Sequence, residues 1–219
     1  MGQAKQRGTR EDRIAQAQRR EQSQPSTSRN QSTTYFDDYS QLAVFQAASE
    51  RLFSGLTTPA EINEQVLEFA RMLGDTTPIF LDCQPELWSR QSCCDGNVQK
   101  YIELHGGEAL CGYRIWYNGP IYIEGERHVV WTDGHTIRDV SFVDSGETRI
   151  VFVSDDKGFD DAPPKVRHAF SGADQRFIEL MNSLDQQTQR LSTQETWDTF
   201  PTYEQWLAGR RQSNLFISS

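Results

Sequence analysis

The 219-residue sequence has no apolar run near the roughly 18 residues that a membrane-spanning helix requires. Its first residues also lack the apolar segment of a secretory signal. We therefore expect no association with a membrane. Hydrophobic residues make up only 36% of the chain and the mean hydropathy is −0.68, so part of the chain is predicted to be a solvated tail. Five Trp, seven Tyr and twelve Phe nevertheless predict a packed core in the remainder.

Cysteine is scarce, and its four positions are Cys83, Cys93, Cys94 and Cys111. Two of them are adjacent and no Cys-x-x-Cys motif is present, which argues against a disulfide framework and favours a reducing cytoplasm. A zinc site would need the last three of these cysteines together with His105, although adjacent cysteines rarely bind one ion. Glycine motifs that bind phosphates or dinucleotides are absent as well. We therefore expect no metal and no cofactor.

The net charge of −9 is unevenly distributed along the chain. Residues 1–30 carry seven basic and three acidic side chains, a net +4, which leaves −13 for the rest. An acidic body is poorly suited to phosphate backbones, so nucleic-acid binding is expected only through this segment, if at all. Residues 1–34 are predicted to be a disordered basic arm. A short helix at Arg10–Glu21 and an RNA- or partner-binding role for the arm remain open alternatives.

From Tyr35 onward the pattern of large apolar side chains predicts a single α+β domain at 35–219, because helical segments flank one run of strands. The domain divides into a helical N-terminal part at 35–75, a core at 90–154 and a helical C-terminal part at 165–210. In the C-terminal part, helices are predicted near Asp174–Leu191 and from Pro201.

The N-terminal part is predicted to hold two helices. The first falls between Tyr35 and Gly55. The second starts at Thr57-Thr58-Pro59, which offers a capping hydroxyl and an early proline, and it ends at Gly74. Its predicted buried face consists of Ile62, Val66, Phe69, Ala70 and Leu73.

The core combines one helix with an antiparallel meander. The predicted helix shows the i, i+3, i+4, i+7 spacing of one helical face at Val98, Tyr101, Ile102 and His105. It ends at Gly106-Gly107. Residues rich in β-branched and aromatic side chains predict strands at Tyr113–Tyr117, Ile121–Trp131, Thr136–Val143 and Arg149–Ser154. Turn sequences separate these strands at Asn118-Gly119-Pro120, Asp133-Gly134 and Asp144-Ser145-Gly146.

The hairpin around Asp133-Gly134 brings two chemically useful side chains together. If these two residues form the whole turn, Thr132 pairs with His135 and, further along the ladder, His128 lies opposite Asp139. Opposed residues share one face of a sheet, with Cβ atoms roughly 5 Å apart. A carboxylate at that distance can orient an imidazole, whereas a slip of one residue would separate the two side chains.

Cys94 is the candidate nucleophile. It lies four residues before Val98, on the buried side of the predicted helix and near its first turn, where the helix dipole and free N–H groups stabilise a thiolate or an oxyanion. Cys93 is rotated away by about 100° in a helix with 3.6 residues per turn. A helix-borne Cys packed on strands that present His and Asp can perform nucleophilic acyl chemistry. We therefore predict Cys94, His128 and Asp139 as catalytic residues.

Three further side chains are predicted to bind substrate, namely Asn97, Glu126 and Glu124. Glu124 and Glu126 lie at alternate positions of the strand and therefore share one face with His128. There they either select the substrate or form a solvated rim. Asn97 is either a residue of the first helical turn or a group that binds the substrate carbonyl. A glycosidase with paired carboxylates is a weaker alternative, because it leaves the Cys and the His unexplained.

Several segments in this order resemble the papain-like cysteine peptidase and amidase superfamily, especially its NlpC-type bacterial branch. The resemblance is closest to a group of small, mostly uncharacterised bacterial and phage proteins. It rests on Cys94-Asp-Gly-Asn97-Val98, Gly106-Gly107, Gly112-Tyr-Arg-Ile-Trp116, Ile123-Glu-Gly-Glu-Arg-His-Val-Val-Trp131 and Asp139-Val. It covers roughly residues 90–154, with Tyr113 and Ser141 departing from the usual residues of the group.

This resemblance implies a fold in which a Cys-bearing helix packs on an antiparallel meander. It also implies a hydrolase of the thiol protease type, or an amide- or acyl-transfer enzyme, acting on a peptide- or amide-like substrate. The superfamily includes several reaction types, so the substrate stays open. The alternative is a non-catalytic binding protein on the same fold, an inhibitor or adaptor associated with phages or with defence against them, that engages a protein partner.

Overall fold

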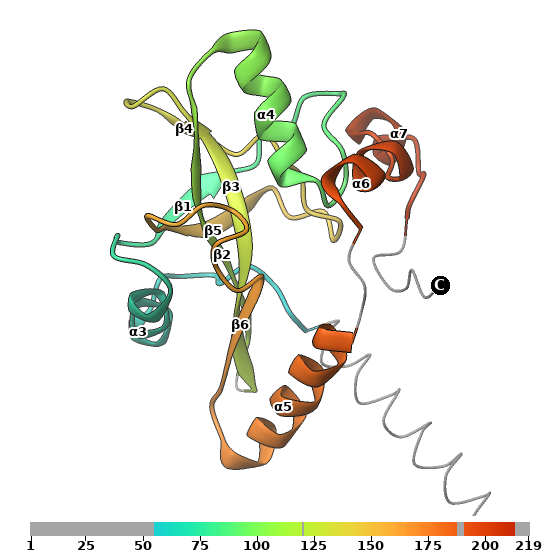
Figure 1. The fold of residues 1–219 in the computed structure, drawn as a ribbon. Helices are drawn as coiled ribbons and strands as arrows, with labels where there is room; N and C mark the ends of the chain where they lie inside the picture. The colour runs from blue at the N-terminus through green and yellow to red at the C-terminus, as the bar shows by residue number, and fades with distance from the viewer. Residues whose placement is uncertain (1–54, 120, 188–190, 213–219) are drawn as a thin grey trace, which may run out of the picture. The chain divides into compact units, whose positions relative to one another are not determined.

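The computed structural model describes residues 55–119, 121–187 and 191–212. The predicted basic arm at 1–34 and the predicted helix between Tyr35 and Gly55 lie outside these residues, apart from Gly55 itself. Helices and antiparallel strands both occur, which confirms the α+β class (Figure 1). Among the described residues, no helix combines the length and the apolar character needed to cross a bilayer.

One six-stranded antiparallel sheet organises the described residues. Its strands are β1 (Ile79–Asp82), β2 (Glu108–Asn118), β3 (Tyr122–Thr132), β4 (Ile137–Arg138), β5 (Arg149–Ser154) and β6 (Lys165–Ala169). The strand order is β1-β5-β2-β3-β4, and β6 pairs with the first half of β3. The prediction placed β2, β3 and β5 correctly but missed β1 and β6, so the part at 165–210 is not wholly helical.

The hairpin of β2 and β3 is the longest element of the sheet, with eleven residues in each strand. Its register places Gly112 opposite His128, and Arg114 opposite Glu126. Side chains at alternate positions of β3 therefore share a face with those of β2, which joins Arg114 to the side of Glu126 and His128.

Helix α3 (Glu64–Leu73) covers the half of the sheet near β2 and β5. Four of the five residues of its predicted apolar face, Val66, Phe69, Ala70 and Leu73, are buried, whereas Ile62 precedes the helix and is half-buried. The start is later than predicted, because the side chain of Asn63 accepts a hydrogen bond from the N–H of Val66 and caps the helix there. Thr57 instead pairs with Tyr117 at the edge of the sheet.

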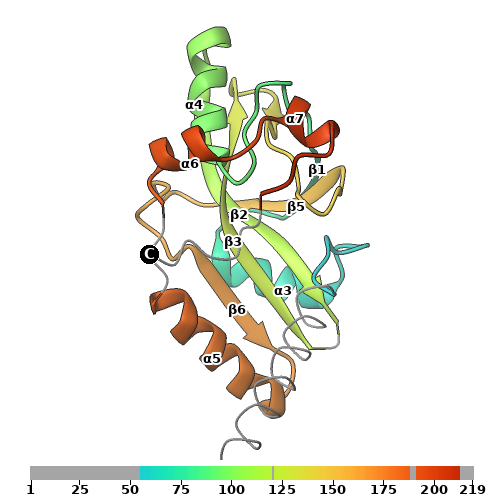
Figure 2. The same cartoon turned by 90° about the vertical axis from the view of Figure 1, so that its right-hand side faces the viewer.

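Helix α4 (Cys94–His105) packs on β3 through Val98 and Tyr101, which contact a cluster containing Val129 and Val140. Three helices follow the sheet, α5 (Gly172–Gln187), α6 (Thr193–Thr199) and α7 (Tyr203–Leu207). Helix α5 lies along β6, and α6 lies beside the start of α4 (Figures 1 and 2). The prediction missed α6 but located α5 and α7.

The turn between β3 and β4 is longer than predicted. Thr132 pairs with Ile137, not with His135, so four residues form the connection. The cause is the side chain of Asp133, whose Oδ1 accepts hydrogen bonds from the N–H groups of His135 and Thr136 at 2.9 and 2.7 Å. This side-chain turn shifts the register by two residues and leaves β4 only two residues long. A shift of two keeps every side chain on its predicted face.

Candidate active site

Cys94 is the first residue of α4, as predicted. The first hydrogen bond within the helix runs from the N–H of Asn97 to the carbonyl of Cys93, at 2.9 Å. The N–H groups of the preceding residues in this turn have no acceptor inside the helix. They carry the positive end of the helix dipole, which favours a thiolate or an oxyanion at this end.

The loop that leads into α4 is held in place by Asn97, which is fully buried. Its Oδ1 accepts a hydrogen bond from the N–H of Arg90 at 2.6 Å, and its Nδ2 donates to the Arg90 carbonyl at 2.9 Å. Nδ2 also donates to Ser141 Oγ at 3.4 Å. The amide is thus committed to internal contacts, so the structure brings Asn97 close to the triad without exposing it to a substrate.

His128 and Asp139 form a buried pair, although they do not pair across a strand ladder. His128 Nε2 lies 3.1 Å from Asp139 Oδ2, and both side chains are at most 2% exposed. The contact is an ion pair whose angle departs from that of an aligned hydrogen bond. Asp139 has left the β3 ladder and forms a bridge with Cys83. Its Oδ1 accepts the N–H of Ser141 at 2.9 Å, which orients the carboxylate toward the imidazole.

The side of β3 that faces away from β2 has an opening at His128. Glu126 is the last residue paired with β6, and Trp131 is the first paired with β4; between them the described residues provide no strand neighbour on that side. Helix α4 packs at this position through Val98, against Val129. Because neighbouring residues of a strand alternate, α4 packs on the face of β3 opposite to the His128 side chain. Cys94 and His128 nevertheless line the same cavity.

Cys94 is the second group that acts on the imidazole. Burial disfavours the charged form of His128, but the neighbouring Asp139 carboxylate and, after it, the Cys94 side chain raise its pKa from 6.5 to about 9. Asp139 contacts the Nε2 nitrogen of the ring, and Cys94 and His128 line the same cavity. All three predicted catalytic side chains are thus brought together.

The other three cysteines are in different environments. Burial, followed by the nearby charge of Asp95, raises the pKa of Cys93 to about 12. Burial also raises the pKa of Cys83, beside Asp139, and that of Cys111. A raised pKa keeps a thiol protonated and poorly nucleophilic. Cys94 is the cysteine that contributes to raising the pKa of the His128 imidazole.

A cavity of about 670 Å³ opens beside the sulfur and the imidazole, since both Cys94 and His128 line it. A volume of this order accommodates a drug-sized molecule or a few residues of a peptide. The start of α6 forms one wall through Ser192, Thr193 and Thr196. Thr193 donates a hydrogen bond to Asp95 of α4, and this contact joins the wall to the nucleophile helix.

The two predicted glutamates have different surroundings. Glu126 lines the cavity, as a substrate-binding residue should. Glu124 does not line it: its carboxylate is 2% exposed and forms ion pairs with Lys165 and Arg167 of β6. Arg167 also pairs with Asp185 of α5, so Glu124 belongs to a buried network that attaches β6 and α5 to the sheet.

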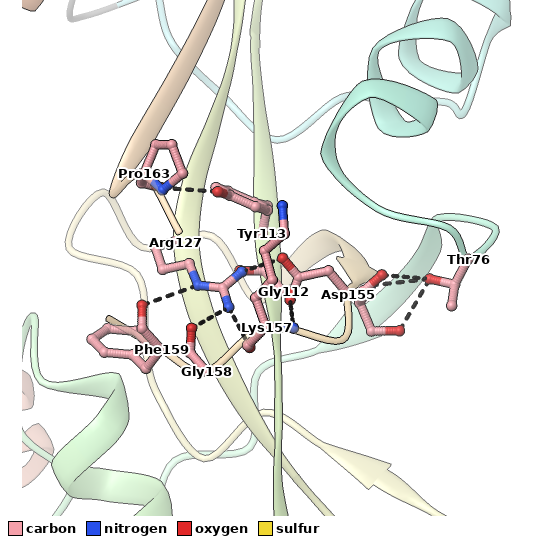
Figure 3. Close-up of polar contacts among 10 residues, drawn as sticks. Thr76, Gly112, Tyr113, Arg127, Asp155, Lys157, Gly158, Phe159 and Pro163 are labelled. Atoms are coloured by element: carbon pink, nitrogen blue, oxygen red, sulfur yellow. Dashed lines mark hydrogen bonds and ion pairs between the residues drawn. The ribbon is translucent and has the colours of Figure 1, made fainter. Parts of the chain in front are cut away.

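The wall opposite α6 is formed by the loop between β5 and β6, which Arg127 holds to the sheet (Figure 3). Its guanidinium pairs with Asp155 at 2.6 Å, and it donates to backbone carbonyls of the loop at Lys157, Gly158 and Phe159. The hydroxyl of Tyr113 donates to the carbonyl of Pro163 at 2.9 Å and fixes the far end of the same loop.

Sequence reasoning missed the basic side chains of the cavity, which are Arg114, Arg127 and Lys165. A three-residue loop at Asn118-Gly119-Pro120 would pair Arg114 with Glu124, whereas the observed register pairs it with Glu126. Both pairings put Arg114 on the face of the two glutamates, so its face could have been found. Lys165 lies on β6, a strand that the sequence pattern did not reveal. The described residues contain no group of three or more His, Cys, Asp or Glu side chains placed to bind a metal ion.

Comparison of the chain with protein-family models, curated proteins and solved structures finds no match.

Proposed function

We propose that this chain is a cysteine hydrolase or acyl-transfer enzyme that acts on a peptide- or amide-like substrate. One observation carries the proposal: a buried imidazole that contacts a carboxylate lines a cavity together with a cysteine. The chemistry of nucleophilic acyl transfer needs this order of groups. The Cys-bearing helix on an antiparallel sheet is also compatible with a papain-like fold, which we propose as the finer fold class.

In the proposed reaction, His128 holds the proton released by Cys94, and the thiolate attacks the carbonyl carbon of the substrate. The N–H groups in the first turn of α4 donate to the oxygen that becomes negative. The imidazolium then transfers its proton to the leaving amine as the C–N bond breaks. Water or a second amine, deprotonated by His128, attacks the thioester and releases Cys94. Asp139 keeps the imidazole oriented throughout.

The described cysteines form no disulfide, which supports a reducing compartment such as the cytoplasm for this chemistry.

The proposal is tested by labelling the protein with a panel of electrophiles directed at catalytic thiols. We expect rapid modification of the wild-type protein at one site, located at Cys94 by peptide mass spectrometry. Cys94→Ala should abolish this modification. Cys93→Ser is the matched control, because it removes the adjacent thiol while a hydroxyl can keep the contacts to Asp95 and to the carbonyl of Thr193.

Equal labelling of the wild-type protein and Cys94→Ala would overturn the proposal. The alternative from the sequence, a non-catalytic binding protein, would then be preferred.

A further inference from the structure

Glu126 is the acidic side chain closest in sequence to His128 on the same face of β3. They are two positions apart along the strand, which corresponds to roughly 7 Å. The Glu126 side chain is 28% exposed, and it lines the cavity that also contains Cys94 and His128. A substrate bound at Cys94 in an extended conformation would therefore pass Glu126 within one or two residues of the reacting carbonyl.

The carboxylate of Glu126 is anchored through only one of its oxygens. Oε2 accepts hydrogen bonds from Arg114 Nε and Trp116 Nε1, both at 2.8 Å, and pairs with Arg114 Nη2 at 2.8 Å. Among the described residues, no hydrogen bond reaches Oε1. A carboxylate oxygen has two lone pairs, so Oε1 is a fixed acceptor on the cavity wall that still has capacity for a donor.

The charge on this carboxylate is permanent and already balanced. Burial alone would favour the neutral acid, but Arg114, Lys165 and the hydrogen bond from Trp116 lower the pKa of Glu126 to about 2. Arg114 lies beside it, and Lys165 pairs with the neighbouring Glu124 at 3.3 Å. A substrate ammonium would meet these two cations, whereas a neutral N–H meets only an available acceptor.

We propose that Glu126 Oε1 accepts a hydrogen bond from a neutral amide N–H of the substrate, one or two residues from the carbonyl that Cys94 attacks. The substrate class is therefore a peptide or peptide-like diamide with an unsubstituted amide nitrogen at that position. This inference rests on the proposed function, because it takes Cys94 as the point of attachment. It adds a specificity-determining group that acts on the substrate away from the reacting atoms.

The test uses acetyl-dipeptidyl fluoromethyl ketones with small, aromatic, acidic and basic side chains. The member that labels wild-type Cys94 fastest is then prepared with a methyl group on each amide nitrogen in turn. We expect methylation at one of the two positions to slow labelling by about ten- to a hundredfold, the range of a hydrogen bond to a charged group. Methylation at the other position should have a smaller effect.

Glu126→Gln separates the hydrogen bond from the bulk of the methyl group. Arg114 and Trp116 can only donate, so the Gln carbonyl takes the place of Oε2 and its amide N–H₂ group faces the cavity. An acceptor becomes a donor at nearly constant volume, and we expect the two probes to label this variant at nearly equal rates. Glu103→Gln, an exposed position of α4, is the matched control and should keep the wild-type ratio.

Each outcome decides one of the two proposals. Rapid labelling of Cys94 with equal rates for the N–H and N-methyl probes would overturn the role of Glu126 and leave the nucleophile in place. A methyl penalty that persists in Glu126→Gln would also overturn it, since the penalty would then be steric. If no probe labels Cys94, the proposed function fails and the subsite fails with it. The wild-type rates decide the matter even if the variant does not fold.

Discussion

Arg127 and His128 are neighbours on β3 with similar surroundings and different roles. Both are buried, and each pairs with a carboxylate from a distant part of the chain, Arg127 with Asp155 at 2.6 Å and His128 with Asp139 at 3.1 Å. Their side chains point to opposite faces of the strand, because neighbouring residues in a strand alternate. Burial and ion pairing alone would assign the same role to both.

The difference lies in how many hydrogen-bonding positions each side chain has left. All three nitrogens of the Arg127 guanidinium donate, to Asp155 and to four backbone carbonyls (Figure 3). The imidazole of His128 uses one nitrogen for Asp139, and the ring lines a cavity together with Cys94. A buried charged group whose hydrogen-bonding positions are all occupied therefore stabilises the structure. A buried group that keeps a hydrogen-bonding position open beside a cavity is available for chemistry.

The largest effect is expected on stability, from removing the guanidinium of Arg127. Arg127→Met leaves Asp155 as a buried charge without its partner and releases the loop carbonyls, which should lower the free energy of unfolding by about 3–5 kcal/mol. Urea denaturation followed by circular dichroism measures this change. Adding Asp155→Leu removes the uncompensated charge and should recover part of the loss. A change below 1 kcal/mol in the single variant, on the order of a surface ion pair, would show that Arg127 is not structural.

The second-largest effect is expected on the labelling rate of Cys94, from removing the imidazole of His128. His128→Gln keeps a polar side chain of comparable size but removes the base, so labelling of Cys94 by a thiol-directed electrophile should slow by about a hundredfold or more. The rate is measured by mass spectrometry at neutral pH, with thermal unfolding as the check on folding. Labelling at the wild-type rate would mean that the imidazole does not activate the sulfur.

The smallest effect sharpens the role of Asp139. Asp139→Asn removes the negative charge that contributes most to raising the pKa of His128 to about 9, so this pKa should fall toward 6.5 by about one unit or more. Titration of the imidazole resonances by NMR measures the change. An unchanged pKa would assign the whole shift to Cys94.

The same pair makes stability depend on pH. The folded-state pKa of His128 is about 9 and its ordinary value is 6.5, so the folded protein holds this proton more tightly than the unfolded chain. The stabilisation is complete below pH 6.5 and is lost as the pH rises through about 9. The difference in unfolding free energy between the wild-type protein and Asp139→Asn should shrink over that window.

Local sequence patterns were sufficient to predict the helix that carries Cys94. The spacing of Val98 and Tyr101 and the stop at Gly106 located α4, and the helix starts at Cys94 as expected. The hairpin argument was partly wrong: the predicted pairing of His128 with Asp139 failed because the Asp133 side chain widens the turn. The two side chains still meet, since a two-residue shift preserves the face and the chain after Arg138 leaves the ladder to bridge with Cys83.

Residue types and their spacing, read locally, predicted His128 and Asp139 as a pair and Cys94 at a helix start, because helix periodicity, strand alternation and turn chemistry act over a few residues. Tertiary structure decided what surrounds them. The cavity wall from α6, the loop held by Arg127 and the anchoring of Glu126 by Arg114 all join residues from separate elements of the chain. Burial decided that Glu124 belongs to the structural network, while Glu126, on the same face of the same strand, lines the cavity. Alternation assigns a face, and only packing decides which residues on that face remain accessible to a substrate.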